Sequence, residues 1–207
     1  MKSLKKSLKA KKIVVIVQAR LTSKRLPGKV LKKISGKPIL QWVLDSVNKA
    51  TKIGEVVIAS PHPIPGFDVF IPSYDIKEND VLSRYYQCAI RYNADIIVRI
   101  TADCPLIDGA WIDYCLEILD EFDYEYVSNT PFCPDGMDVE VFTIGSLIKA
   151  NKKATSNYDR EHVTPYIRKH FKMGELTHPT LNKYYDVKIS IDTEQDLKRV
   201  RRIINEL

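Results

Sequence analysis

The sequence predicts a single α/β domain built around a mainly parallel sheet. Short apolar runs, which are typical of buried parallel strands, alternate with segments whose apolar residues recur at helical spacing. Neither an internal repeat nor an interdomain linker interrupts this alternation between residues 13 and 207. Such a pattern is characteristic of folds in which helices cover a parallel sheet.

The first half of the chain supplies three predicted strands, at residues 13–17, 55–59 and 94–101. Apolar spacing predicts one helix that begins near Pro38 and two further helices, at residues 81–90 and 111–119. Proline suits the first turn of a helix, where its missing N–H would have no partner. Four prolines between residues 61 and 75 exclude a helix from that segment.

The second half continues the pattern to the C-terminus. We expect short strands at 126–128 and 139–142, helices at 144–154 and 161–171, and a last strand at 185–191. Pro165 should strain the helix at 161–171. Thr193 followed by Asp196 forms a capping-box pattern that predicts a closing helix.

The positive charge of the chain is concentrated at its N-terminal end. The formal net charge is +6, and residues 1–12 contain six lysines and no acidic residue. The rest of the chain has equal numbers of basic and acidic residues, whereas a nucleic-acid-binding domain should carry its basic excess on the folded body. We therefore expect a disordered basic tail at 1–12, one domain at 13–207, and no nucleic-acid partner.

Apolar runs and cysteine spacing indicate the cellular compartment. No apolar run approaches the ~18–20 residues of a membrane span, and the lysine-rich start lacks the apolar core of a signal peptide. The four cysteines show no C-x-x-C spacing, which favours free thiols in a reducing compartment. We expect a cytoplasmic protein without a membrane span.

A basic, turn-rich loop follows the first predicted strand. It contains Arg20, Arg25 and Lys29, with Ser23 and Gly28 between them. Ligands of open α/β sheets bind beyond the carboxyl ends of strands, and arginine and lysine suit phosphate oxygens. The loop therefore predicts a site for several phosphates; the alternative is a solvated basic loop.

Two aspartates follow other predicted strands, so they should lie at the same sheet edge. Asp103 follows the strand at 94–101, and Asp192 follows the strand that ends at residue 191. Magnesium commonly takes one or two carboxylates and completes its coordination with water and phosphate. The plainer alternatives are a turn former for Asp103 and a helix-cap residue for Asp192.

A second polar group lies further along the chain. Asp138 and Glu140 are two apart on a predicted strand, so they should point the same way and bind hydroxyls of a polar acceptor. A solvated strand face explains them equally well. Arg160 and His162 form another polar cluster, in which His162 would be a general base or, alternatively, a hydrogen-bonded structural residue.

Five motifs together resemble one known family. The segment QARLTSKRLPGKVLKKISGKPIL is similar to the nucleotide-binding signature of cytidylyltransferases that activate sugar acids, such as the CMP-KDO and CMP-acylneuraminate synthetases. The similarity continues, in the expected order, through VRITADCPLID, PDGMDVEVF, REHVTPYIR and ISIDTEQDL. The spore-coat polysaccharide biosynthesis protein F subfamily is the nearest match to these motifs.

The resemblance implies a three-layer α/β/α sandwich with a mixed, mainly parallel sheet, a nucleotide-diphosphosugar-transferase (glycosyltransferase-A-like) fold. It implies transfer of CMP from CTP to a sugar acid or related acceptor, with Mg²⁺ as cofactor and pyrophosphate as product. Arg20, Lys29, Asp103 and Asp192 would be catalytic, with Asp103 and Asp192 on the metal. Nucleotide contacts would come from Gln18, Ala19, Arg20, Ser23, Arg25, Lys29, Thr101 and Asp103, and acceptor contacts from Asp138, Glu140, Arg160 and His162.

Three matters stay open at the level of sequence. Phosphate and metal residues do not read the base, so another NTP or a non-sugar acceptor is an alternative. A non-catalytic nucleotide-binding homologue is a second alternative, although retention of both aspartates argues against it. The acceptor and the oligomeric state are not fixed by the sequence, and a homodimer is compatible with it.

Overall fold

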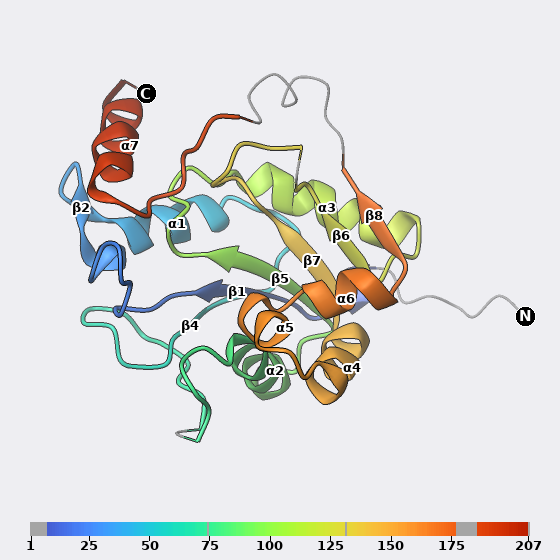
Figure 1. Cartoon of the computed structure of the whole chain (residues 1–207). Coiled ribbons are helices and arrows are strands. Elements are labelled where there is room, and N and C mark those ends of the chain that lie inside the picture. Colours follow the sequence, from blue (N-terminus) through green and yellow to red (C-terminus); the bar gives the residue numbers. More distant parts are fainter. Residues whose placement is uncertain (1–7, 74, 131, 177–185, 207) are drawn as a thin grey trace, which may run out of the picture.

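A six-stranded mixed sheet forms the centre of the protein (Figure 1). The computed structural model describes residues 8–73, 75–130, 132–176 and 186–206. The sheet order is β4-β1-β5-β7-β6-β8, with bounds β1 Ile13–Gln18, β4 Glu55–Ala59, β5 Ile96–Thr101, β6 Tyr126–Ser128, β7 Glu140–Thr143 and β8 Met173–Glu175. β1 runs parallel to β4 and β5, and β8 parallel to β6, whereas β7 is antiparallel to both neighbours. The predicted mixed, mainly parallel sheet is confirmed.

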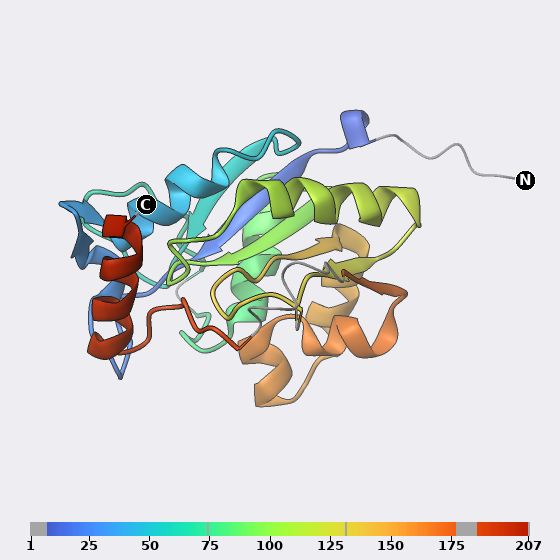
Figure 2. The same ribbon diagram turned by 90° about the horizontal axis from the view of Figure 1, so that it is seen from above.

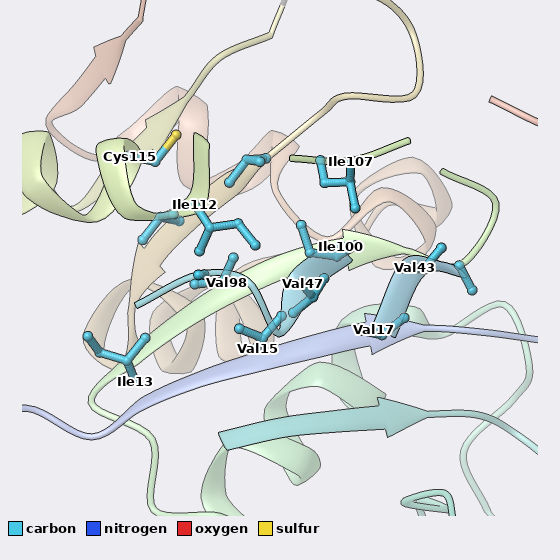
Figure 3. Packing of buried hydrophobic residues seen from close by; sticks show 14 of the residues in the cluster. Ile13, Val15, Val17, Val43, Val47, Val98, Ile100, Ile107, Ile112 and Cys115 are labelled. Atoms are coloured by element: carbon cyan, nitrogen blue, oxygen red, sulfur yellow. The ribbon is translucent and has the colours of Figure 1, made fainter. Parts of the chain in front are cut away.

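Helices cover both faces of this sheet (Figures 1 and 2). One layer contains α1 Ile39–Val47 and α3 Gly109–Glu121, and the other contains α2 Val81–Arg91, α4 Ile144–Lys153, α5 Asn157–His162 and α6 Pro165–His170. Side chains of β1 alternate between the layers: Val15 and Val17 pack beside α1 and α3, as Figure 3 shows, and Ile16 packs beside α2 and α4. The arrangement is a three-layer sandwich.

The closing helix α7 Glu194–Glu206 packs at one end of the sheet, beside the small sheet of β2 Lys33–Ile34 and β3 Lys37–Pro38. The predicted capping box is confirmed. The Thr193 hydroxyl accepts a hydrogen bond from the Asp196 N–H at 3.2 Å, and the Asp196 carboxylate accepts one from the Thr193 N–H at 2.9 Å. A separate apolar cluster joins α7 to Leu26 in the loop after β1.

The chain between β7 and β8 differs from the predicted single helix at 161–171. The chain instead forms α5 and α6, separated at Val163, whose φ is +69°. Pro165 explains the difference, because a proline that would break a helix interior is well placed as the first residue of a new helix.

The predicted strand at 185–191 is also corrected. Tyr185 lies outside the described residues, and within 186–191 only Lys188 forms an isolated bridge, to Asp135. Ile189 and Ile191 are both buried without strand pairing, and Ile191 packs in the apolar cluster that contains Leu197 of α7. The last strand of the sheet is β8, which the sequence did not predict.

Part of the predicted N-terminal tail contacts the domain. Residues 1–7 of the predicted tail lie outside the described residues. Leu8–Ala10 form a short 3-10 helix, η1, and Leu8 packs against the core, while Lys11 pairs with Asp120 at 3.0 Å. Leu8 and Lys11 of the predicted tail therefore contact the folded domain. No helix within the described ranges is long and apolar enough to cross a membrane.

Candidate active site

The loops after β1 and β5 leave the sheet side by side. Gln18 and Thr101 are register partners at the ends of these strands. The Ala102 N–H donates to the Gln18 carbonyl at 3.0 Å, which continues the pairing past the strand end. Asp103 therefore lies next to the basic loop, as expected for adjacent parallel strands.

The basic loop is folded by a left-handed turn at Gly28, where φ is +64°. The Gly28 N–H donates to the Leu21 carbonyl at 2.8 Å and closes the loop, while the buried Leu26 anchors it beneath α7. Glycine suits this conformation because it has no Cβ to clash. The turn delivers Lys29 into the short helix η2 Lys29–Leu31.

Lys29 joins the two aspartates that the sequence predicts at this edge. Its ammonium donates to Asp103 Oδ2 at 2.6 Å, to the Ile191 carbonyl at 2.9 Å and to Asp192 Oδ1 at 3.1 Å. Only 9% of Lys29 is exposed. All three ammonium donors have partners, so Lys29 must exchange at least one of them to bind a phosphate.

Asp192 is surrounded by positive charge. Arg25 approaches its Oδ1 at 2.8 Å, and Lys188 donates to its Oδ2 at 2.9 Å. Burial alone would raise the pKa of Asp192, but the hydrogen bonds from Lys188 and Lys29 and their charges outweigh it and lower that pKa. Asp192 is therefore ionised at neutral pH.

A strap of residues 189–192 holds Asp192 in place. The Ile191 N–H donates to the Asp103 carbonyl at 2.9 Å. The N–H groups of Ile189 and Ser190 both donate to the Asp135 carbonyl, at 2.7 and 2.9 Å. The strap thus bonds to two loops at the sheet edge instead of to a strand.

A cavity of about 340 Å³ opens above these residues. Every residue predicted to bind the nucleotide or the metal lines it: Gln18, Ala19, Arg20, Ser23, Arg25, Lys29, Thr101, Asp103 and Asp192. Arg20 stands at its wall with a side chain 44% exposed and pairs with Glu78 at 3.5 Å. The structure therefore brings together residues that the sequence places far apart.

Asp103 and Asp192 fit a divalent cation such as Mg²⁺. Their carboxylates converge on one point, since both lie within hydrogen-bond distance of the Lys29 ammonium. Within the described parts of the chain, no group of three or more His, Cys, Asp or Glu side chains could hold a metal. Two carboxylates suit an ion that completes its coordination with water and substrate phosphates.

A second cavity of about 240 Å³ adjoins the first at Thr101, which lines both. Three of the predicted acceptor residues, Asp138, Glu140 and His162, line this second cavity, together with Arg168. Burial raises the pKa of Asp138, although hydrogen bonds from Gly136 and Cys133 act against it. These three predicted acceptor residues thus lie beside the predicted nucleotide residues.

Glu140 is held by three donors in the wall of the second cavity. Arg99 pairs with its Oε2, and the hydroxyls of Tyr126 and Thr164 donate to Oε1 at 2.7 and 2.6 Å. Burial would raise the pKa of Glu140, but the charge of Arg99 and these hydrogen bonds lower it. Both oxygens are engaged, so Glu140 supports the wall of the cavity.

Arg160 does not line the second cavity. Its guanidinium donates to both carboxylate oxygens of Asp80, each at 2.9 Å, and to the Asn151 carbonyl at 2.9 Å. Asp80 is the N-cap of α2, so the pair ties α5 to α2. The structure therefore places Arg160 in a packing role, away from the predicted acceptor site.

Sequence reasoning missed Arg84 and Glu78, which also line the first cavity, and Lys188, which pairs with Asp192. One of them has a sequence signal. Arg84 follows Val81 by three residues and precedes Cys88 by four, so it lies on the apolar side of α2. Charged residues are rarely buried without a reason, and an arginine on that face marks a special position.

Comparison with known proteins gives the family. The cytidylyltransferase family profile matches residues 14–204. An uncharacterized protein, MJ1063, of Methanocaldococcus jannaschii is 38% identical over 90% of this chain and 81% of its own length. Spore coat polysaccharide biosynthesis protein SpsF of Bacillus subtilis is 29% identical over 92% and 85%. A 3-deoxy-manno-octulosonate cytidylyltransferase of Geobacter metallireducens is 36% identical over 49% of this chain and 42% of its own.

Solved structures agree with this result. A cytidylyltransferase from Leptospira borgpetersenii superposes with a TM-score of 0.84 at 29% identity, covering 95% of this chain and 88% of its own. The fold, the order of the motifs and the profile match therefore converge. This chain belongs to the cytidylyltransferase family.

Proposed function

We propose that this protein transfers CMP from CTP to a sugar acid or related acceptor, releasing pyrophosphate, in the synthesis of a cell-surface polysaccharide or glycoconjugate precursor. The observation that carries the proposal is the meeting of Lys29, Asp103 and Asp192 in a cavity lined by every predicted nucleotide residue. Membership of the cytidylyltransferase family supports CTP as the donor. The names of similar proteins support a sugar-acid acceptor in a polysaccharide pathway.

The reaction forms a bond between an acceptor oxygen and the α-phosphorus and breaks the bond from that phosphorus to the bridging oxygen of pyrophosphate. Arg20, Arg25 and Lys29 neutralise the triphosphate and hold it in line for attack. Asp103 and Asp192 would hold Mg²⁺, which would polarise the α-phosphate. Lys29 exchanges a carboxylate oxygen for a phosphate oxygen, because its three donors are already used.

The acceptor binds in the second cavity, whose contact with the first at Thr101 brings its oxygen close to the α-phosphate. Arg168 lines this cavity, and its side chain forms no ion pair with the described residues, which suits an acceptor carboxylate. Tyr158, 64% exposed, lines the same cavity and provides an apolar surface for a sugar ring. His162 is the candidate general base there.

A cytoplasmic location fits this reaction. The four cysteines are all free and buried, which suits a reducing compartment.

The decisive assay is pyrophosphate release with each of four NTPs against a panel of sugar acids and sugar phosphates. We expect release with CTP plus one class of sugar acid and Mg²⁺, and none with CTP alone. Turnover with another NTP would favour a different nucleotidyltransferase. Binding of CTP without turnover on any acceptor would favour a non-catalytic homologue.

A further inference from the structure

Arg84 is a buried arginine in the wall of the nucleotide cavity. It comes from the first turn of α2, is only 1% exposed, and lines the cavity together with Arg20 and Glu78. One guanidinium nitrogen donates to the backbone carbonyl of Glu78. Its Nε, like that of Arg99, is buried and has no hydrogen-bond partner among the described residues.

Two other largely buried arginines show what Arg84 lacks. Arg99 pairs with Glu140, and Arg160 pairs with Asp80 at 2.8 Å. Within the described ranges Arg84 forms no salt bridge. The nearby carboxylate of Glu78 instead forms an ion pair with Arg20, a second cation on the same cavity wall. Burial of a cation without a counter-charge is costly, so this arrangement needs another source of negative charge or acceptor atoms.

We propose that Arg84 binds the nucleotide and completes its hydrogen bonds on a pair of adjacent acceptor atoms of that ligand. The inference rests on the proposed function, since the ligand is the nucleotide of the same cavity. A guanidinium presents parallel N–H donors in a planar fork, which matches two oxygens of a phosphate. The same fork matches O2 and N3 of cytosine, both acceptors, whereas N3 of uracil is a donor.

A ligand-binding role for Arg84 and a structural role have opposite effects on the stability of the unliganded protein. A structural arginine stabilises the unliganded protein, so its removal lowers the melting temperature. A buried arginine that gains its counter-charge only from a ligand destabilises the unliganded protein. Its removal should therefore leave the melting temperature unchanged or raise it. Arg84→Met keeps much of the side-chain volume and removes the charge, so it separates the two roles.

The experiment compares wild type, Arg84→Met, Arg84→Lys and the control Arg91→Met. Arg91 lies at the exposed end of the same helix and does not line the cavity. Each protein is melted without ligand and titrated by calorimetry with CTP, UTP and inorganic tripolyphosphate in Mg²⁺. We expect Arg84→Met to melt no lower than wild type and to bind CTP at least tenfold more weakly, with the control unchanged.

Arg84→Lys keeps the charge but loses the planar fork, so it should bind CTP several-fold more weakly than wild type. If Arg84→Met does not fold, the CTP affinity of Arg84→Lys tests the proposal. If the affinity for tripolyphosphate falls as much as the affinity for CTP, the acceptor atoms that Arg84 binds are phosphate oxygens. Unchanged tripolyphosphate binding with a lost preference for CTP over UTP assigns them to the base. Wild-type CTP affinity in a folded Arg84 variant overturns the proposal, whereas failure of the wild type to bind CTP overturns the proposed function instead.

Discussion

Lys29 is the residue on which two distant aspartates meet. Its ammonium bridges Asp103, in the turn after β5, and Asp192, two residues before α7. Only 9% of Lys29 is exposed. The two carboxylates would repel each other without a cation between them. In the unliganded protein Lys29 supplies that cation, which keeps the two carboxylates close together.

Replacement of either aspartate by asparagine tests the metal assignment. Each change keeps the side-chain shape and removes one negative charge, so we expect turnover to fall on the order of a hundredfold or more. Asp192→Asn should also lower the melting temperature, because it leaves Arg25, Lys29 and Lys188 without that counter-charge. Mg²⁺-dependent turnover and thermal melting measure both effects.

Asp108→Asn is the matched control for this experiment. Asp108 caps α3 by accepting a hydrogen bond from the Ala110 N–H at 3.0 Å, and asparagine caps equally well. Its turnover and melting temperature should match wild type. Near wild-type turnover in both Asp103→Asn and Asp192→Asn would end the metal assignment.

Local sequence predicts the place of Asp103, because this residue follows a buried strand whose carboxyl end lies at the edge of the sheet. Asp192 reaches the same edge for a different reason: the strand predicted before it is absent, and the hydrogen-bonded strap at 189–192 carries it there. Local sequence does not predict the partners of Arg160 and Glu140. Arg160 pairs with Asp80 because α5 packs on α2, and Glu140 accepts from Thr164 because the chain breaks at Val163. These pairings depend on how the helices and loops pack, and the local sequence around one polar residue does not predict that packing.

Short connecting elements, rather than the long helices, complete the site. The strap at 189–192 crosses the sheet edge against a turn at Gly136, whose φ is +110°. A Cβ added at Gly136 would lie 2.5 Å from the Ser190 nitrogen, which is too close for any side chain. The turn therefore requires glycine both for its backbone conformation and for its contact with the strap.

Gly136→Ala should displace the strap that carries Asp192. We expect a loss of about 1–3 kcal/mol in the free energy of unfolding and a clear fall in turnover. Alanine is strained at the positive φ of this residue, and its Cβ would clash with the backbone of the strap at Ser190. Gly145→Ala is the control, since a Cβ there meets only the Thr143 hydroxyl at 3.9 Å and the residue lies in α4. Denaturant unfolding and turnover check the pair. Wild-type behaviour in Gly136→Ala would show that the strap does not hold the site.

Arg160 and Arg168 lie near one another in sequence but have opposite expected roles. Arg160→Met should lower the free energy of unfolding by about 1–3 kcal/mol, because Asp80 loses two charged hydrogen bonds, and should leave the acceptor KM unchanged. Arg168→Met should leave stability unchanged and raise the acceptor KM, because Arg168 lines the second cavity. The reversed pattern would restore Arg160 as an acceptor residue.

At the scale of the whole molecule, the alternation of apolar runs and helical spacing was enough to predict a layered α/β domain. The sequence did not predict β8, because Met173–Glu175 is too short to show a period, and it wrongly predicted a strand at 185–191 from the alternation of Ile189 and Ile191. The order of the strands comes from long-range pairing. The resemblance to cytidylyltransferases implied the three-layer fold but not this order, which only the structure shows.

The layered fold places two cavities at one edge of the sheet, joined at Thr101. The first is lined by cations and carboxylates, and the second by polar and aromatic side chains. We propose that the first cavity binds CTP with its metal and that the second binds the acceptor.

Calorimetric titration of the wild-type protein with CTP, UTP, ATP and GTP in the presence of Mg²⁺ tests this claim most directly. We predict that CTP binds more tightly than the other three nucleotides and that removal of Mg²⁺ with a chelator abolishes or strongly weakens binding. Equal or tighter binding of ATP or GTP would contradict the assignment of this cavity to CTP.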